Sequence, residues 1–319
     1  DYAATIPQLA FFIYQGMFAV ITPALITGAF AERIKFNAYV IFIALWSIFV
    51  YAPVAHWVWG IGGWIRQLGA LDFAGGTVVH ISSGAAALAA ALVVGRRKGF
   101  GEEPFIPHNV PMTLLGAGIL WFGWFGFNAG SALASGALAS IAFVTTHLAA
   151  ASGTLGWLTL EKISNKKPTA LGAASGLVAG LVAITPAAGF VTPMAALVIG
   201  FAAGAVCYLA IKLKWKLKYD DALDVVGVHL VGGSLGALAT GIFANKAINS
   251  LGANGLLAGS PDLLLKQFIA VAVTIAYSFV VSFLMLQILA KTVGLRVTDK
   301  EEELGLDITQ HEEIGYNEF

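Results

Sequence analysis

Two histidines lie deep inside separate apolar segments, and they are the residues whose type and position could do chemistry. His80 lies in DFAGGTVVHISSGAAALAAALVVG (72–95), and His229 lies in LDVVGVHLVGGSLGALATGIF (223–243). A charged side chain at the centre of a membrane costs about 2.5–3.5 kcal/mol on insertion scales, so such residues usually face a bundle interior or a polar pathway. Either histidine alone fits a neutral imidazole bonded to a helix backbone or a hydroxyl. As a pair in matching segments, they predict a pathway that handles protons or cations.

The composition is that of a membrane protein. Hydrophobic residues make up 58% of 319 positions, charged residues only 11%, and the mean hydropathy is +0.81. A soluble domain carries about 25% charged residues. The net charge is zero and the sequence has no recurring basic groove, which argues against binding to nucleic acid. The single cysteine, Cys207, excludes an intrachain disulfide, and we interpret it as a small core residue.

Apolar runs of about 20 residues, long enough to span a bilayer, predict nine membrane crossings. Their approximate limits are 6–30, 36–60, 73–95, 110–129, 138–160, 169–188, 193–212, 222–243 and 264–292. Of the 18 Lys and Arg residues, 15 lie in the tail, in the loops after the first, third, fifth and seventh runs, or at the last two positions of the run that precedes them. By the positive-inside rule this side is cytoplasmic, so the chain is expected to start outside and end inside. Because the chain opens with Asp1 almost directly into a crossing, we expect that residues preceding it are missing.

An internal repeat relates the two halves of the chain. The string ITPA occurs at 21–24 and at 184–187, in the first and sixth runs, and H-x-x-x-G begins at His80 and at His229, in the third and eighth. Both matches are five crossings apart, so the copies traverse the membrane in opposite directions. Inverted repeats of this kind are typical of transporters whose site lies near the midplane. Each histidine is about eight residues, or roughly 12 Å, into its run, which places both near the middle of a layer about 30 Å thick.

Other ionisable residues have plainer interpretations. Asp72 and Asp224 each begin a histidine-bearing run, where a carboxylate can cap free N–H groups and complement the helix dipole. Asp220 and Asp221 are interpreted as interfacial charges, and His147 as a core histidine without a repeat partner. Two histidines without further Cys, Asp or Glu at that depth do not predict a metal site, so no metal or other cofactor is expected. The sequence shows no pairing of a nucleophile with a base, which argues against an enzyme.

Several strings distributed over the whole chain carry a family resemblance. They are GAFAERIKF (28–36), GALDFAGGTVVHIS (69–82), GWFGFNAGSA (123–132), ITPAAGF (184–190), DDALDVVGVH (220–229) and EELGLDITQHEE (302–313). With them the sequence resembles the ammonium transporter family (Amt/Mep/Rh), most closely its bacterial and archaeal Amt branch. The resemblance implies an inverted-repeat fold of eleven crossings in the cell membrane, of which nine are present here. It also implies a homotrimer with one pore through each subunit.

The resemblance further implies functions for individual residues. An outer cation site would comprise Phe18, Trp59 and Ser131, braced by the buried carboxylate of Asp72. A stacked phenyl gate would consist of Phe18 and Phe127. Aromatic faces can hold a cation that has lost part of its water. The loop WVWGIGGW (57–64) has one residue more than is usual in the family after Trp59.

The predicted function is transport of ammonium and methylammonium. Ammonium would be recruited outside and deprotonated, and ammonia would pass the twin histidines His80 and His229, which line the pore and relay the proton. Residues 1–294 would form the transmembrane domain. Residues 295–319 would form a cytoplasmic regulatory tail that couples subunits and helps to dock a PII-type signal protein. Two alternatives remain open: an ammonium-sensing receptor of the same fold, and a membrane cytochrome with the two histidines as haem ligands.

Overall fold

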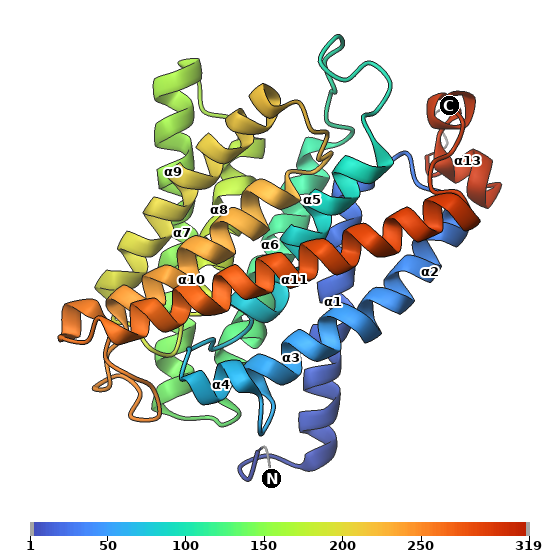
Figure 1. Ribbon diagram of the computed structural model, residues 1–319. Helices are drawn as coiled ribbons and strands as arrows, with labels where there is room; N and C mark the ends of the chain where they lie inside the picture. Colours follow the sequence, from blue (N-terminus) through green and yellow to red (C-terminus); the bar gives the residue numbers. More distant parts are fainter. Residues whose placement is uncertain (1–2, 317–319) are drawn as a thin grey trace.

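The chain folds as a bundle of helices (Figure 1). A computed structural model describes residues 3–316 and contains no β-strand within that range, so the predicted all-α polytopic fold is confirmed. In the described residues, eight helical stretches are long and apolar enough to cross a membrane. They are α1 (Gln8–Phe30), Phe36–Leu68, Gly76–Val94, Val110–Ala132, α7 (Ala137–Asn165), α9 (Pro193–Leu217), Val226–Phe243 and α11 (Asp262–Thr292).

Four of these stretches are composite. Their parts are α2 (Phe36–Trp46), η1 (Ser47–Tyr51), α3 (Ala52–Trp59) and α4 (Trp64–Leu68); η2 (Gly76–Ile81) and α5 (Ser82–Val94); α6 (Val110–Ala129) and η3 (Gly130–Ala132); and η4 (Val226–Val231) and α10 (Gly232–Phe243). A short 3₁₀ turn, η5 (Leu256–Ala258), precedes α11. The segments η1, η2 and η4 are π-helical, a geometry that is frequent at functional sites. The two predicted histidines lie in η2 and η4.

The sixth predicted crossing is shorter than its apolar pattern suggests. Helix α8 (Ala170–Ile184) has only 15 residues, and tight turns replace the helix up to Phe190. Pro186 has no N–H group to continue the ladder. The turns close their own hydrogen bonds, since the Phe190 N–H donates to the Ala187 carbonyl at 2.8 Å. Residues 181–191 are all buried, and irregular backbone at membrane depth is tolerated where protein covers it.

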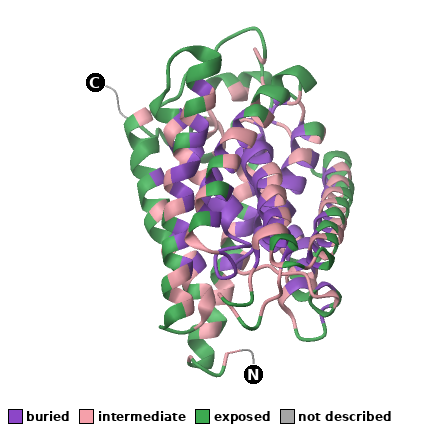
Figure 2. Ribbon diagram, turned by 90° about the vertical axis from the view of Figure 1, so that its left-hand side faces the viewer, coloured by how far each residue is buried: buried purple, intermediate pink, exposed green. Residues whose placement is uncertain are grey.

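The crossings that carry the histidines form the centre of the bundle. The η2–α5 stretch has 83% of its most apolar window buried, against 11% for the stretch that contains α6. Figure 2 shows the same pattern, with buried residues inside and exposed residues on the outer helix faces. Small residues allow close packing around this centre: a Cβ added to Gly153 would lie 2.8 Å from the Cα of Gly180.

A buried network of ionic and hydrogen bonds closes one end of the bundle. Arg33 is fully buried and donates to the carbonyls of Ala29, Gly95 and Asp220. Arg97 binds both carboxylate oxygens of Asp220 at 2.9 Å. Burial raises the pKa of Asp220, but hydrogen bonds from Arg97 outweigh it and hold this pKa below its ordinary value. The prediction of an interfacial charge at Asp220 is therefore wrong, because the guanidinium groups allow the carboxylate to be buried.

The tail packs against the same end. The Val297 N–H donates to the Arg33 carbonyl at 3.1 Å. Thr298 and Glu301 then form a capping box at the start of α12 (Asp299–Leu304). Helix α13 (Leu306–His311) follows. Arg296 forms an ion pair with Glu302 at 2.7 Å. The two ends of the described range, residues 3 and 316, lie at opposite ends of the bundle (Figure 1).

Candidate functional site

The structure brings the two histidines together. The Nδ1 atoms of His80 and His229 are 3.1 Å apart, which is hydrogen-bond distance. His80 is completely buried and His229 is 8% exposed. Segments η2 and η4 contact each other directly, so the meeting point lies in the buried centre of the bundle.

Two glycines permit this approach, and they explain the repeated H-x-x-x-G pattern. Gly84, four residues after His80, packs against the backbone of Leu230, and a Cβ there would lie 2.3 Å from the Leu230 nitrogen. Gly233, four residues after His229, faces η2, where a Cβ would lie 3.0 Å from the Cβ of His80. Each glycine thus makes room for the other half's histidine-bearing segment.

A carboxylate caps the start of η2. One oxygen of Asp72 accepts the N–H groups of Gly75 and Gly76 at 2.8 and 2.7 Å, and the other accepts those of Thr77 and Val78 at 2.7 and 3.2 Å. Burial raises the pKa of Asp72, and the four N–H groups oppose that rise. This carboxylate therefore fixes the backbone of the π-helical segment that carries the first histidine.

The matching cap of η4 is Asp221, whereas the sequence predicted Asp224. Asp221 is fully buried and accepts the Val226 N–H at 2.7 Å. It precedes His229 by eight residues, the spacing that also separates Asp72 from the first histidine. Asp224 has a φ of 62° and its carboxylate pairs with Lys214, so it is not available to cap the helix. The prediction of Asp221 as an interfacial charge is wrong because its carboxylate is buried and caps η4. The prediction of Asp224 as the cap is wrong because its carboxylate is paired with Lys214.

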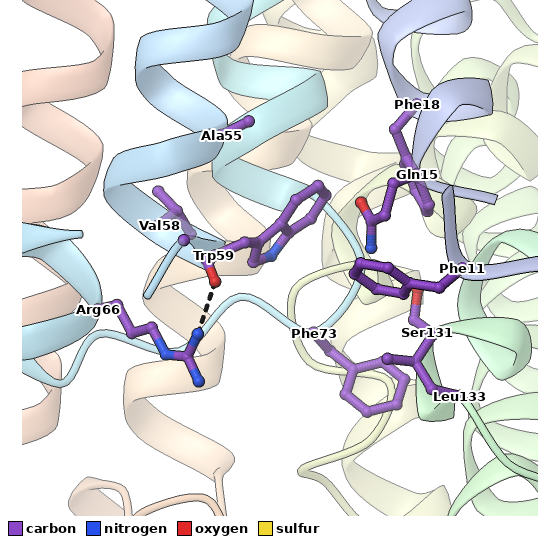
Figure 3. A pocket seen from close by; sticks show the side chains of 11 residues that line it. Phe11, Gln15, Phe18, Ala55, Val58, Trp59, Arg66, Phe73, Ser131 and Leu133 are labelled. Atoms are coloured by element: carbon purple, nitrogen blue, oxygen red, sulfur yellow. Dashed lines mark hydrogen bonds between the residues drawn. The ribbon is translucent and has the colours of Figure 1, made fainter. Parts of the chain in front are cut away.

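A cavity of about 400 Å³ lies beside α4, and α4 is at the end of the bundle opposite the tail (Figure 1). It is lined by Phe11, Gln15, Phe18, Ala55, Val58, Trp59, Gly60, Arg66, Phe73, Ser131 and Leu133 (Figure 3). The three residues predicted for an outer site, Phe18, Trp59 and Ser131, are all among them. The rings of Phe18 and Trp59 meet edge to face, with centroids 5.4 Å apart. The Trp59 indole donates to the Asp72 carbonyl at 2.9 Å, which ties the cavity wall to the η2 cap.

Aromatic rings connect this cavity with the histidine pair. The ring centroids of Phe18 and Phe127 are 4.8 Å apart at an interplanar angle of 69°, so the predicted pair meets edge to face and is not stacked. Edge-to-face contact suits the quadrupoles of two phenyl rings better than a face-to-face arrangement. Phe127 in turn lies nearly parallel to His80, with centroids 5.9 Å apart. A continuous line of ring contacts thus runs from Trp59 to His229.

The Ser131 hydroxyl belongs to a small hydrogen-bonded cluster that includes Tyr14. Ser131 donates to the Phe127 carbonyl at 2.8 Å and lies 2.9 Å from the Tyr14 hydroxyl. Tyr14 also packs edge to face against Phe18, with centroids 5.1 Å apart. Sequence reasoning missed Tyr14, although its position four residues before Phe18 places both on one face of α1 and could have revealed it.

Gln15 and Arg66 were also missed. Both line the cavity, and Arg66 donates through Nη1 to the Trp59 carbonyl at 2.7 Å (Figure 3). Arg66 lies on α4, beyond the loop that follows Trp59, so no periodic pattern indicates its direction. The structure thus places a cation on the wall of a cavity for which the sequence predicted only Phe18, Trp59 and Ser131.

The prediction of a core position for His147 is wrong. Helix α7 buries Thr145, Thr146 and Ala149 toward its neighbours, and the helical rotation turns His147 outward. Its exposed imidazole stacks on Trp121, with ring centroids 5.0 Å apart. It therefore lies away from the paired histidines.

Comparison with known proteins is consistent with this arrangement. The sequence model described as Ammonium Transporter Family matches residues 1–316. The chain belongs to that family. It is 54% identical to an ammonium transporter of Bacillus subtilis over 319 residues, covering 100% of this chain and 78% of the relative. It is 53% identical to the ammonium transporter Amt1 of Archaeoglobus fulgidus, covering 97% and 78%.

Solved structures of the family have the same fold. The crystal structure of Candida albicans Mep2 matches with a TM-score of 0.88 and 37% identity, covering 93% of this chain and 68% of that one. A structure described as a sensor Amt protein matches with a TM-score of 0.87 and 36% identity, covering 94% and 76%. Membership in the ammonium transporter family makes this chain a multi-span membrane protein of a transporter family and not of an enzyme family.

Proposed function

We propose that this chain conducts ammonia derived from ammonium, and also methylammonium, through a passage within its own bundle. The observation that carries the proposal is the line of ring contacts that joins the cavity at Trp59 and Phe18 to His80 and His229. Family membership supports the same substrate.

Recruitment would take place in the cavity. The π faces of Trp59 and Phe18 attract a cation, and Ser131, whose own proton goes to the Phe127 carbonyl, keeps a lone pair for an N–H donor. A potassium ion matches ammonium in charge but donates no hydrogen bond. Ser131 would therefore favour ammonium over potassium. Replacing Ser131 with Ala should reduce that preference, and unchanged competition by potassium in an uptake assay would contradict this step.

Passage beyond the cavity favours the neutral molecule. Moving an isolated ammonium-sized charge into an apolar interior costs many kcal/mol, whereas ammonia avoids most of that penalty. Ammonia would pass between Phe18 and Phe127, whose edge-to-face contact must open by side-chain rotation. In the neutral histidine pair one Nδ1 donates and the other accepts, so each ring keeps its Nε2 for a permeant or for a proton relay.

A histidine substitution tests the proposal. Replacing His229 with Ala removes the hydrogen-bond partner of a buried imidazole, and methylammonium uptake into proteoliposomes should fall at least about fivefold. The matched control is His147→Ala, which removes an exposed imidazole whose ring contacts are with Trp121 and Phe125 and not with the pair, and it should leave uptake near the wild-type rate. Equal uptake and equal selectivity in both variants would refute the proposed passage.

The orientation and partners belong to the same proposal. The end that holds Arg33, Arg97 and the tail would face the cytoplasm of a cell with this protein in its inner membrane, because it carries most of the basic residues. The chain would assemble as a homotrimer, and residues 295–319 would couple subunits and help to dock a PII-type signal protein. Deletion of the residues after Leu295 should alter uptake, and an unchanged rate would argue against coupling.

A sensing function is the second candidate, since a structure described as a sensor Amt protein is among the neighbours of this fold. The uptake assay separates the two candidates, because a sensor would bind ammonium without flux. A haem site is not supported. Metal–imidazole bonds of about 2 Å would hold two opposed nitrogens about 4 Å apart, whereas the Nδ1 atoms here are 3.1 Å apart. A Soret band in the purified protein would overturn that conclusion.

A further inference from the structure

A buried indole beside the histidine pair has no function in the proposed passage. Trp124 of α6 is 3% exposed and lies nearly parallel to His80, with ring centroids 5.5 Å apart and planes 16° apart. Phe127 completes a cluster of three nearly parallel rings, 5.0 Å from Trp124. Among the described residues, no comparable ring stack is found for His229, whose only ring contact is with His80. The two histidines are thus held differently.

The orientation of the indole is fixed by one hydrogen bond. Trp124 Nε1 donates to the Thr185 hydroxyl at 3.0 Å. That hydroxyl uses its own proton on the Leu181 carbonyl at 2.8 Å, so only its lone pair is left for the indole. Both Thr185 and Trp124 are buried, and water cannot easily replace either partner.

Thr185 is the threonine of the second ITPA string, which gives the repeat a physical purpose. In the first string the equivalent threonine, Thr22, is also fully buried and donates to the Phe18 carbonyl at 2.5 Å. Thr22 therefore bonds to the backbone of Phe18, whose ring lines the cavity, whereas Thr185 holds the indole of Trp124 against the histidine pair. The proposed passage does not use Thr185 itself, since its hydroxyl has both partners already.

We propose that Trp124, held by Thr185, is the positioning residue of His80. The indole fixes the imidazole plane, so Nδ1 stays on His229 while Nε2, which has no hydrogen-bond partner in the described structure, stays available to the permeant. An indole face also stabilises an adjacent cation, so His80 rather than His229 would hold the proton during relay. This inference rests on the proposed transport function and extends it to the asymmetry of the pair.

The test removes the acceptor and keeps the shape. In Thr185→Val the indole N–H loses its partner and the ring is free to turn, so the maximal rate of methylammonium uptake should fall about three- to tenfold. The pH profile of uptake should change, while KM stays near wild type because the cavity residues are untouched. Thr185→Ser keeps the hydroxyl and should restore the wild-type rate and profile.

Thr146→Val is the matched control. Thr146 is buried, accepts a side-chain hydrogen bond from Asn128 at 2.9 Å and donates to a carbonyl one turn earlier, as Thr185 does, but no ring contact links it to the histidines. The variant should unfold at a lower temperature without changing the pH profile. Thr185→Val with the same rate and pH profile as this control would overturn the inference.

A spectroscopic measurement separates the failure of this inference from the failure of the transport function. Nitrogen-15 NMR of labelled histidines in the purified chain reports the protonation of each ring whether or not the protein conducts. Thr185→Val should alter the titration of the His80 signals, assigned by His80→Gln, and leave those of the exposed His147 in place. Unaltered His80 signals would overturn the inference, whereas absent uptake in the wild type would overturn the transport proposal alone.

Discussion

The substitution Gly84→Ala tests whether close helix crossing produces the histidine pair. The added Cβ would lie 2.3 Å from the nitrogen and 2.7 Å from the Cα of Leu230, where ordinary contacts begin at 3.4 Å. The backbone of η4 must therefore retreat by about 1 Å. Since His229 is the residue next to Leu230, the Nδ1 to Nδ1 distance should lengthen from 3.1 Å to about 4 Å, beyond hydrogen-bonding range.

The added methyl group should lower the free energy of unfolding. Overpacking of a tight interior costs about 1–3 kcal/mol, and the better helix propensity of Ala returns at most about 1 kcal/mol. Gly118→Ala is the control, because a Cβ there meets no atom within 4 Å in the described structure and only the propensity gain remains. We expect Gly84→Ala to lower the unfolding temperature and Gly118→Ala to leave it unchanged or raise it.

The assay is methylammonium uptake into proteoliposomes, together with thermal unfolding of the purified protein. Gly84→Ala should reduce uptake severalfold even at temperatures at which it stays folded, because the histidine pair is separated. Gly118→Ala should transport at the wild-type rate. If Gly84→Ala were as stable and as active as the control, the close crossing at Leu230 could not be what sets the histidine geometry.

Three further outcomes concern charged side chains at the caps and at the cavity wall. Burial and the nearby Asp224 raise the pKa of Asp221 from 3.8 to about 7, so its contribution to stability declines as pH rises from about 4 to about 7. Relative to Asp221→Asn, the free energy of unfolding of the wild type should therefore fall by up to about 4 kcal/mol over that window. Melting temperatures of the two proteins that change equally with pH would contradict this. Asp72→Asn, with one acceptor oxygen for four N–H groups, should cost about 1–3 kcal/mol and lower the melting temperature. Arg66→Gln removes a cation from the cavity wall and should lower the KM for methylammonium by up to about fivefold, because two positive charges repel each other by at most about 1 kcal/mol in water. An equal fall in KM in Arg66→Lys, which keeps the charge, would exclude this electrostatic cause.

Much of the fold follows from apolar length and repeat spacing, but both fail where tertiary contacts compete with local preference. The run at 169–188 is apolar enough to predict a crossing, yet the helix ends at Ile184 because Pro186 interrupts it. The surrounding protein donates hydrogen bonds to the freed carbonyls, as the Phe73 N–H does to the Pro186 carbonyl at 3.1 Å. His147 has a sequence environment like that of a core residue. Its direction depends on which face of α7 meets the neighbouring helices, and no single-helix pattern identifies that face.

The cap of η4 shows the same limit. Asp220, Asp221 and Asp224 are alike in type and close in sequence, so composition cannot distinguish the cap from the ion-paired groups. The distinction arises from ion-pair partners that only the folded chain supplies, namely Arg97 for Asp220 and Lys214, one helix end away, for Asp224. The eight-residue spacing from the histidine, shared with Asp72, was the available signal that favours Asp221.

By itself the sequence determined the membrane class, the inverted repeat and the position of His80 and His229 within their apolar runs, because apolar length and residue spacing are local properties of a chain. Only the tertiary structure decided that the two imidazoles touch, that Phe18 and Phe127 meet edge to face, and that Tyr14, Arg66 and Trp124 adjoin the same line of rings. The reason is physical: contact geometry depends on how closely two crossings approach, and glycine at positions 84 and 233 sets that distance through steric exclusion between distant segments.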